Sequence, residues 1–184
     1  MYDELKIISY PDPRLRRVSV PVKKFDEDLG ALARRMFELM REAKGVGLAA
    51  AQVGKNIRLF ISNHTQKPED DRVYVNPVLF DADGEETAQE GCLSIPNINV
   101  EVVRPKSVRM QAKDLSGNPI EQSEIGYVAR IWQHELDHLN GILLIDRMGP
   151  TAKVENRKIL KELEEKYAAD TPMKTAAKPA NPTF

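Results

Sequence analysis

The sequence predicts an α+β domain, and three observations lead to this prediction. The middle of the chain holds several short segments of strand-forming residues bounded by turn residues. A helix that is apolar most of the way around follows them, which is typical of a buried helix. Amphipathic helices are expected near both ends. We therefore expect antiparallel or mixed sheets packed around a central buried helix, with peripheral N-terminal and C-terminal helices.

The first elements follow from turn residues and apolar spacing. Prolines in residues 10–22 predict an irregular lead-in. A helix is predicted over 26–44, because Asp26 is a suitable N-cap and leucines and methionines recur at helical spacing. Gly45 stands where a left-handed residue is expected to end this helix.

Strands and turns are predicted for the middle of the chain. Pro77 suggests an edge or a bend in its strand. The predicted strands are 56–62, 72–79, 98–103, 106–113 and 119–122, and the predicted turns are 81–84 and 115–118.

Two more helices are predicted in the last third. The buried one is expected over 124–140, with Ser123 as its cap and Gly141 at its end. A highly charged helix is expected over 152–168. The remaining residues, 169–184, are mostly Ala, Pro, Thr and Lys, which predicts a disordered tail after a single domain of residues 1–168.

Composition bounds the class of protein. The 184 residues suffice for a hydrophobic core, and 41% hydrophobic with 30% charged residues is ordinary for a globular protein. A formal net charge of −1 gives no broad electrostatic case for binding nucleic acid or an anionic membrane. No apolar run is long enough to span a bilayer, and the N-terminus does not look like a signal peptide. We expect a cytoplasmic protein.

The most informative motif is His134-Glu135-Leu136-Asp137-His138. On a helix, residues four apart share a face, so His134 and His138 can reach one metal ion while Glu135 stands beside it as a general base. The alternative is two satisfied core histidines, but so many ionisable groups on a buried helix favour a compensating cation. Asp137 is expected to support a ligand histidine, or else to be a solvent-facing charge or to pair with a nearby arginine.

A hydrolytic metal site needs three protein ligands and an open position. Downstream of His138 there is no histidine, and His64 lies in a polar loop where a solvated imidazole is the better interpretation. Cys92 remains, in what reads as a glycine-led turn into an extended segment. Taken alone, a single cysteine is more often a buried thiol than a ligand.

Three segments together resemble the signature motifs of the peptide deformylase family, in the family's order. The resemblance covers about residues 4–165, and the combination is far more specific than any one motif. The segments are Gly45-Val46-Gly47-Leu48-Ala49-Ala50-Ala51-Gln52, Glu90-Gly91-Cys92-Leu93-Ser94 and His134-Glu135-Leu136-Asp137-His138.

The resemblance implies an α+β metallohydrolase that removes the N-formyl group from the initiator methionine of nascent polypeptides. Cys92, His134 and His138 would hold the metal, and Glu135 would transfer the proton. Gln52 and the backbone N–H of Leu93 would stabilise the oxyanion. The family lines the substrate site at the positions of Gly45, Val46, Gly47, Tyr127 and Ile131.

Other features of the resemblance concern support and specificity. Glu90 and Arg104 fit an ion pair near the cysteine, or else are ordinary surface charges. Arg130 and Trp132 are bulkier than their counterparts in some relatives. Residues 97–99 lack a basic residue that some relatives carry. These departures leave open which residues after methionine are preferred.

The resemblance implies one divalent metal ion, Fe(II) as the physiological ion, with zinc, nickel or cobalt able to substitute. The helix 152–168 is a candidate for a transient ribosome contact, although its nearly balanced charge favours packing on the domain. The alternatives are a zinc endopeptidase of the His-Glu-x-x-His type and a structural metal site, which usually has four protein ligands.

Overall fold

The computed structural model describes residues 2–171. The helices are α1 (Glu27–Glu42), α2 (Tyr127–Leu139), α3 (Leu144–Arg147), α4 (Pro150–Glu155) and α5 (Arg157–Asp170), and short 3-10 turns lie at Pro13–Arg16, Ala50–Val53 and Pro68–Asp70. The strands are β1 (Gly47–Ala49), β2 (Leu59–Ser62), β3 (Arg72–Asp83), β4 (Glu86–Cys92), β5 (Ile95–Arg104), β6 (Ser107–Lys113) and β7 (Pro119–Ile125).

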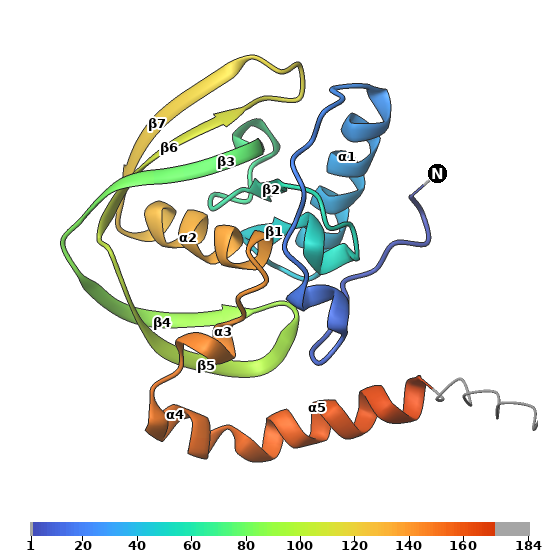
Figure 1. Cartoon of the computed structure of the whole chain (residues 1–184), viewed down its shortest axis with the longest axis vertical. Helices are drawn as coiled ribbons and strands as arrows, with labels where there is room; N and C mark the ends of the chain where they lie inside the picture. Colours follow the sequence, from blue (N-terminus) through green and yellow to red (C-terminus); the bar gives the residue numbers. More distant parts are fainter. Residues whose placement is uncertain (1, 172–184) are drawn as a thin grey trace, which may run out of the picture.

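Two separate antiparallel sheets confirm the predicted α+β class. One has five strands in the order β1-β2-β3-β6-β7, and the other is the β4–β5 hairpin. Helix α2 lies between them, with β3, β6 and β7 on one side and β4 and β5 on the other (Figure 1). The prediction of a central buried helix is therefore confirmed.

Helix α2 packs its apolar face on the five-stranded sheet. Ala129, Trp132 and Leu139 join the core formed by aromatic and aliphatic side chains of that sheet. Trp132 is fully buried and meets the ring of Tyr74 edge-on, with centroids 5.6 Å apart. Because this side of α2 is occupied by packing, its polar residues are left for the side that faces β4 and β5.

The β4–β5 hairpin has a core of its own. Alternate residues of β5 are buried together with Cys92 and residues of α3, and apolar side chains of α4 and α5 pack against them. A third cluster lies beneath α1 and holds β1 and β2 in place. Among the described residues, no helix is both long enough and apolar enough to cross a membrane.

The start of α1 is as predicted, but its end differs. The Asp26 side chain accepts a hydrogen bond from the Leu29 N–H at 3.1 Å, so the N-cap is confirmed. The left-handed residue is Lys44 (φ 55°) rather than Gly45. The N–H groups of these two residues bond back into the last turn, to Arg41 and Met40, as in a Schellman motif.

The predicted boundaries of the later helices were partly wrong. Helix α2 begins at Tyr127, because Ser123 belongs to β7 and lies opposite Arg109 of β6. Gly141 follows the end of α2 with φ +73°, as predicted. The charged helix is divided at Asn156 into α4 and α5, and α3 was not predicted. Residues 169 and 170 end α5, and the rest of the predicted tail from 172 lies outside the described residues.

The strands agree with the prediction only in part. Strand β3 continues to Asp83, so only Gly84 remains of the predicted turn. Pro77 marks a bend rather than an edge, since β3 is a central strand whose register shifts between Val75 and Val78. Strands β1 and β4 were not predicted, and the turn expected around Cys92 lies one residue later, between β4 and β5.

The end of α2 gives a test of the fold. A Cβ on Gly141 would lie 2.5 Å from the backbone oxygen of Arg16, in a left-handed conformation. We expect Gly141→Ala to lower the free energy of unfolding by about 2–5 kcal/mol, combining backbone strain and overpacking. Gly149→Ala is the matched control, because nothing lies within 4 Å of its Cβ position. Equal urea midpoints for the two variants would contradict this account of Gly141.

Candidate metal centre

The two histidines of the motif lie on the side of α2 that faces the β4–β5 hairpin. Their rings are 5.0 Å apart between centroids and nearly perpendicular. His138 is 1% exposed. The four-residue spacing therefore places both imidazoles on the same face of the helix, as predicted.

Cys92, the last residue of β4, completes the cluster. Its Sγ lies 3.3 Å from Nε2 of His138, and one ligand atom from each of Cys92, His134 and His138 lies within 4.8 Å of the others. A tetrahedral ion with bonds near 2.0–2.3 Å needs donors about 3.3–3.8 Å apart, so the three atoms can close on an ion with shifts of about 1 Å. His64 is exposed and is not part of the cluster.

Glu90 supports His134 from the hairpin. Its Oε2 lies 3.0 Å from Nδ1 of His134, which leaves Nε2 of the imidazole for a metal. Arg104 donates to both oxygens of the same carboxylate, at 2.6 and 2.9 Å. Burial alone would raise the pKa of Glu90, but the hydrogen bonds from His134 and Arg104 outweigh it and lower this pKa to about 2. The expected Glu90–Arg104 ion pair is thus present.

The electrostatics of the cluster favour a cation. Burial lowers the pKa of His134, but hydrogen bonds with Cys92 and Glu90 and the charges of Cys92 and Glu135 outweigh that effect and raise it. Burial lowers the pKa of His138, and the charges of His134 and Arg104 lower it further. The cluster thus favours positive charge beside Cys92 and Glu90, which is the charge that a divalent ion would supply.

Glu135 lies in the same site without being one of the three ligands. It is 4% exposed, and its Oε2 is buried without a hydrogen-bond partner. Burial raises the pKa of Glu135 to about 7, and His134 and Arg104 oppose this only in part. Gly47 packs directly against this carboxylate, because a Cβ at this position would lie 2.4 Å from Glu135 Oε1 and would force the Glu135 side chain to move. Such a carboxyl group is suited to exchange a proton near neutral pH.

Gln52 is fixed beside the cysteine. Its Oε1 accepts a hydrogen bond from the Ala49 N–H at 2.9 Å, so its amide nitrogen is turned toward the site. That nitrogen lies 3.2 Å from Ser94 Oγ and 3.7 Å from Cys92 Sγ. The side chain is therefore a buried, oriented donor next to the candidate metal position.

A cavity of about 440 Å³ opens onto this cluster and brings together residues from distant parts of the sequence. Gly45 lies against Leu93, where a Cβ would be 2.6 Å from the leucine side chain. Tyr127 stands 57% exposed. The predicted site residues that line the cavity are Gly45, Val46, Gly47, Gln52, Cys92, Leu93, Tyr127, Ile131, His134 and Glu135.

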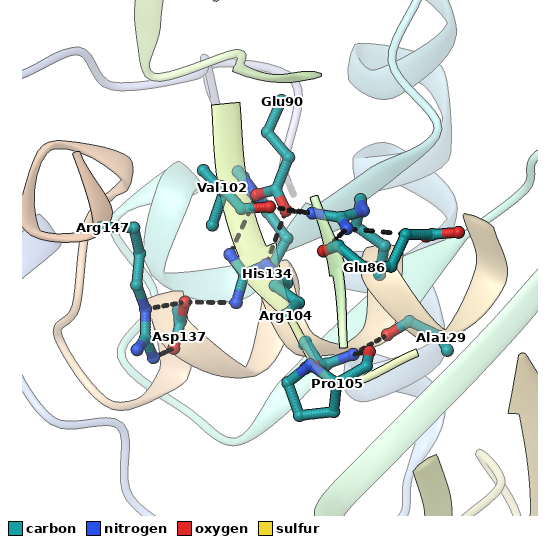
Figure 2. Close-up of polar contacts among 11 residues, drawn as sticks. Glu86, Glu90, Val102, Arg104, Pro105, Ala129, His134, Asp137 and Arg147 are labelled. Atoms are coloured by element: carbon teal, nitrogen blue, oxygen red, sulfur yellow. Dashed lines mark hydrogen bonds and ion pairs between the residues drawn. The ribbon is translucent and has the colours of Figure 1, made fainter. Parts of the chain in front are cut away.

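Asp137 pairs with arginines rather than with a histidine, which settles the interpretations left open by the sequence. Figure 2 shows it between Arg104, at 2.9 Å, and Arg147, whose Nε is 3.0 Å away. The buried charges around Glu90 thus continue toward the surface, because Arg147 is partly exposed.

Sequence reasoning missed the role of Arg130. It was noted only for its bulk, but it is 4% exposed and donates to Glu90 Oε1 at 2.7 Å. Its position one helical turn before His134 was the available signal, since the two side chains share a face of α2. Ser94, the partner of Gln52, was also missed, because a contact between two turns 42 residues apart leaves no periodic pattern.

Known proteins share both the sequence and this fold. The family model for polypeptide deformylase matches residues 4–154. A peptide deformylase of Rhodopirellula baltica is 44% identical over 165 residues, covering 89% of this chain and 82% of the relative. One of Chromobacterium violaceum is 41% identical, covering 88% and 96%.

A crystal structure of the peptide deformylase from Plasmodium falciparum has a TM-score of 0.87 at 40% identity, covering 89% of this chain and 98% of that one. The fold, the three motifs and the shared length agree with one another. The chain belongs to the polypeptide deformylase family.

Proposed function

We propose that this site hydrolyses the formamide bond at the N-terminal methionine of nascent polypeptides and releases formate. The observation that carries the proposal is a cavity lined by Cys92, His134 and the buried carboxylate of Glu135, which has an unpartnered oxygen. His138 completes the Cys-His-His cluster beside it. A divalent ion bound to Cys92, His134 and His138 would polarise the formyl carbonyl and make water more acidic.

Glu135 is proposed as the group that transfers protons. It would accept a proton from the attacking water, whose oxygen bonds to the formyl carbon. When the C–N bond breaks, the same carboxyl group would deliver the proton to the departing amine. The burial of Glu135 keeps bulk water away from the carboxylate. Because Gly47 has no side chain, space for a group as small as formyl is left beside the carboxylate.

Gln52 and Leu93 are proposed to stabilise the oxyanion. Negative charge develops on the formyl oxygen in the tetrahedral intermediate, and neutral donors fixed in advance can meet it there. The Gln52 amide is held by the Ala49 N–H and cannot turn away freely. Leu93 lies in the turn after Cys92 and lines the same cavity, so its backbone N–H is the second proposed donor.

The substrate's first residue is proposed to occupy the rest of the cavity. Val46, Tyr127 and Ile131 offer apolar surface for the methionine side chain, and Gly45 and Gly47 leave the backbone accessible. The endopeptidase alternative is not favoured, because the chain belongs to the deformylase family.

The identity of the metal and the partners beyond the peptide remain predictions. Fe(II) is proposed as the physiological ion, and a Cys-His-His set with an open position also accepts zinc. Ribosome contact through α5 and a cytoplasmic location are likewise proposed. Apolar residues of α5 pack on the hairpin core, and two pairs join Lys158 to Glu162 and Lys161 to Glu165, which favours a packed, solvated helix.

The direct test is formate release. We expect the protein loaded with Fe(II) or zinc to release formate from a formyl-Met-Ala-Ser peptide and to leave internal peptide bonds of an unformylated control intact. A chelator should abolish the activity, and added metal should restore it. Cleavage of internal bonds without formate release would instead support the endopeptidase alternative.

Glu135→Gln separates proton transfer from metal binding. We expect kcat to fall by about 10²–10⁴-fold, because the amide cannot accept the proton. The metal content should be unchanged, as Glu135 is not one of the clustered ligands. Glu165→Gln on the exposed surface of α5 is the control. Undiminished formate release by Glu135→Gln would remove the role assigned to this residue.

Gln52→Leu tests the oxyanion donor. Loss of the amide should lower kcat by about 10²–10³-fold with little change in metal content. Gln111→Leu, on the exposed side of β6, should behave like the unchanged protein. If Gln52→Leu lost its metal but kept its activity per bound metal, Gln52 would be a support for Cys92 and not an oxyanion donor.

A further inference from the structure

The candidate metal centre is divided between two parts of the fold. His134 and His138 belong to α2, whereas Cys92 ends β4 of the separate hairpin. The hairpin shares no strand ladder with the five-stranded sheet on which α2 packs. Two short links, residues 84–85 and 105–106, join the hairpin to β3 and β6. Beyond these links, side-chain contacts between α2 and the hairpin help to set the distance between the sulfur and the two imidazoles.

Arg130 makes the most extensive of these contacts. It comes from α2, and its guanidinium donates hydrogen bonds to three groups of the hairpin and lies 3.5 Å from a fourth, the Glu86 carboxylate. Nη1 donates to Glu90 Oε1 at 2.7 Å and to the Val102 carbonyl at 2.9 Å. Nη2 donates to the Glu86 carbonyl at 2.6 Å. One side chain thus binds both strands of the hairpin. Figure 2 labels the three hairpin residues that accept these bonds, Glu86, Glu90 and Val102.

Arg104 cannot replace this connection. It belongs to β5, so its two hydrogen bonds to Glu90 join residues within the hairpin. Its contact with α2 is the ion pair with Asp137. Arg130 and His134, by contrast, lie one turn apart on α2 and bind the two different oxygens of the same Glu90 carboxylate.

A stabilising role alone does not explain a buried arginine here. Removing a guanidinium from water is costly, and apolar residues of similar size are often at least as stabilising in such places. Arg130 also lines the cavity and keeps Nε buried without a partner. Its planar guanidinium donates directional hydrogen bonds to three fixed acceptors, which an apolar side chain cannot do.

We propose that Arg130 is a positioning residue that sets the separation between Cys92 and the two histidine ligands. It acts through Glu90 and the carbonyls of Glu86 and Val102. The inference rests on the proposed metal site and adds a determinant of its geometry. Without Arg130, the hairpin can shift relative to α2, and the cluster no longer matches the bond lengths of a bound ion.

The test uses the full chain loaded with Co(II), because a cobalt–thiolate bond gives a charge-transfer absorption that reports on Cys92. Three variants are compared with the unchanged protein. These are Arg130→Met, Arg130→Lys and, as a control for general destabilisation, Leu32→Ala in the core beneath α1. Metal release is followed by chelator competition, and the stability of the metal-free protein is measured in parallel.

We expect Arg130→Met to release cobalt about 10- to 100-fold faster and to weaken the thiolate band, which is the usual cost of losing a group that supports a metal ligand. Arg130→Lys should be intermediate, since an ammonium reaches some of the acceptors without the fork geometry. Leu32→Ala should unfold at lower denaturant and release cobalt at the unchanged rate.

The outcomes separate the two proposals. If the unchanged protein gives no cobalt–thiolate band, the metal site itself is wrong. If that band is present, and if Arg130→Met and Arg130→Lys both keep the band and release cobalt at the rate of the unchanged protein, Arg130 has no positioning role. If Arg130→Met does not fold, the comparison of Arg130→Lys with Leu32→Ala decides in the same way.

Discussion

The structure depends on the carboxylate of Glu90, whose capacity for hydrogen bonds is filled. Arg104, Arg130 and His134 donate four hydrogen bonds to its two oxygens, which is about the full capacity of a carboxylate. A buried charge with fewer partners would be strongly unfavourable. Because the donors come from β5 and α2, satisfying this one group also fixes the hairpin on the helix and sets the orientation of a candidate ligand.

The two faces of α2 explain why such a polar helix can be buried. One face fills the space beneath the five-stranded sheet with Ala129, Trp132 and Leu139. The opposite face meets a hairpin that supplies a matching carboxylate, arginine and thiol. The site thus obtains rigidity from apolar packing on one side and directionality from hydrogen bonds on the other. This combination places reactive groups at a cavity without leaving the helix unsupported.

The sequence predicted the fold class and the residues that form the cluster, because helical spacing and the three motifs are local signals. It did not predict β1 or β4, which are short or largely polar and depend on partners far along the chain. The prediction of Ser123 as a helix cap was wrong, because this residue belongs to β7 and pairs with β6. Arg130 was undervalued because its acceptors include backbone carbonyls, which leave no trace in side-chain patterns.

The attachment of β4 and β5 by two short links and by side chains, without a shared strand ladder, has a dynamic consequence. Regions joined in this way can open as a cooperative unit at a lower free energy than the main core. Amide protons of the hairpin should then exchange with solvent earlier than those of β2 and β3. A ligand that bridges Cys92 to α2 would oppose this opening. Binding at the site would then slow amide exchange throughout the hairpin.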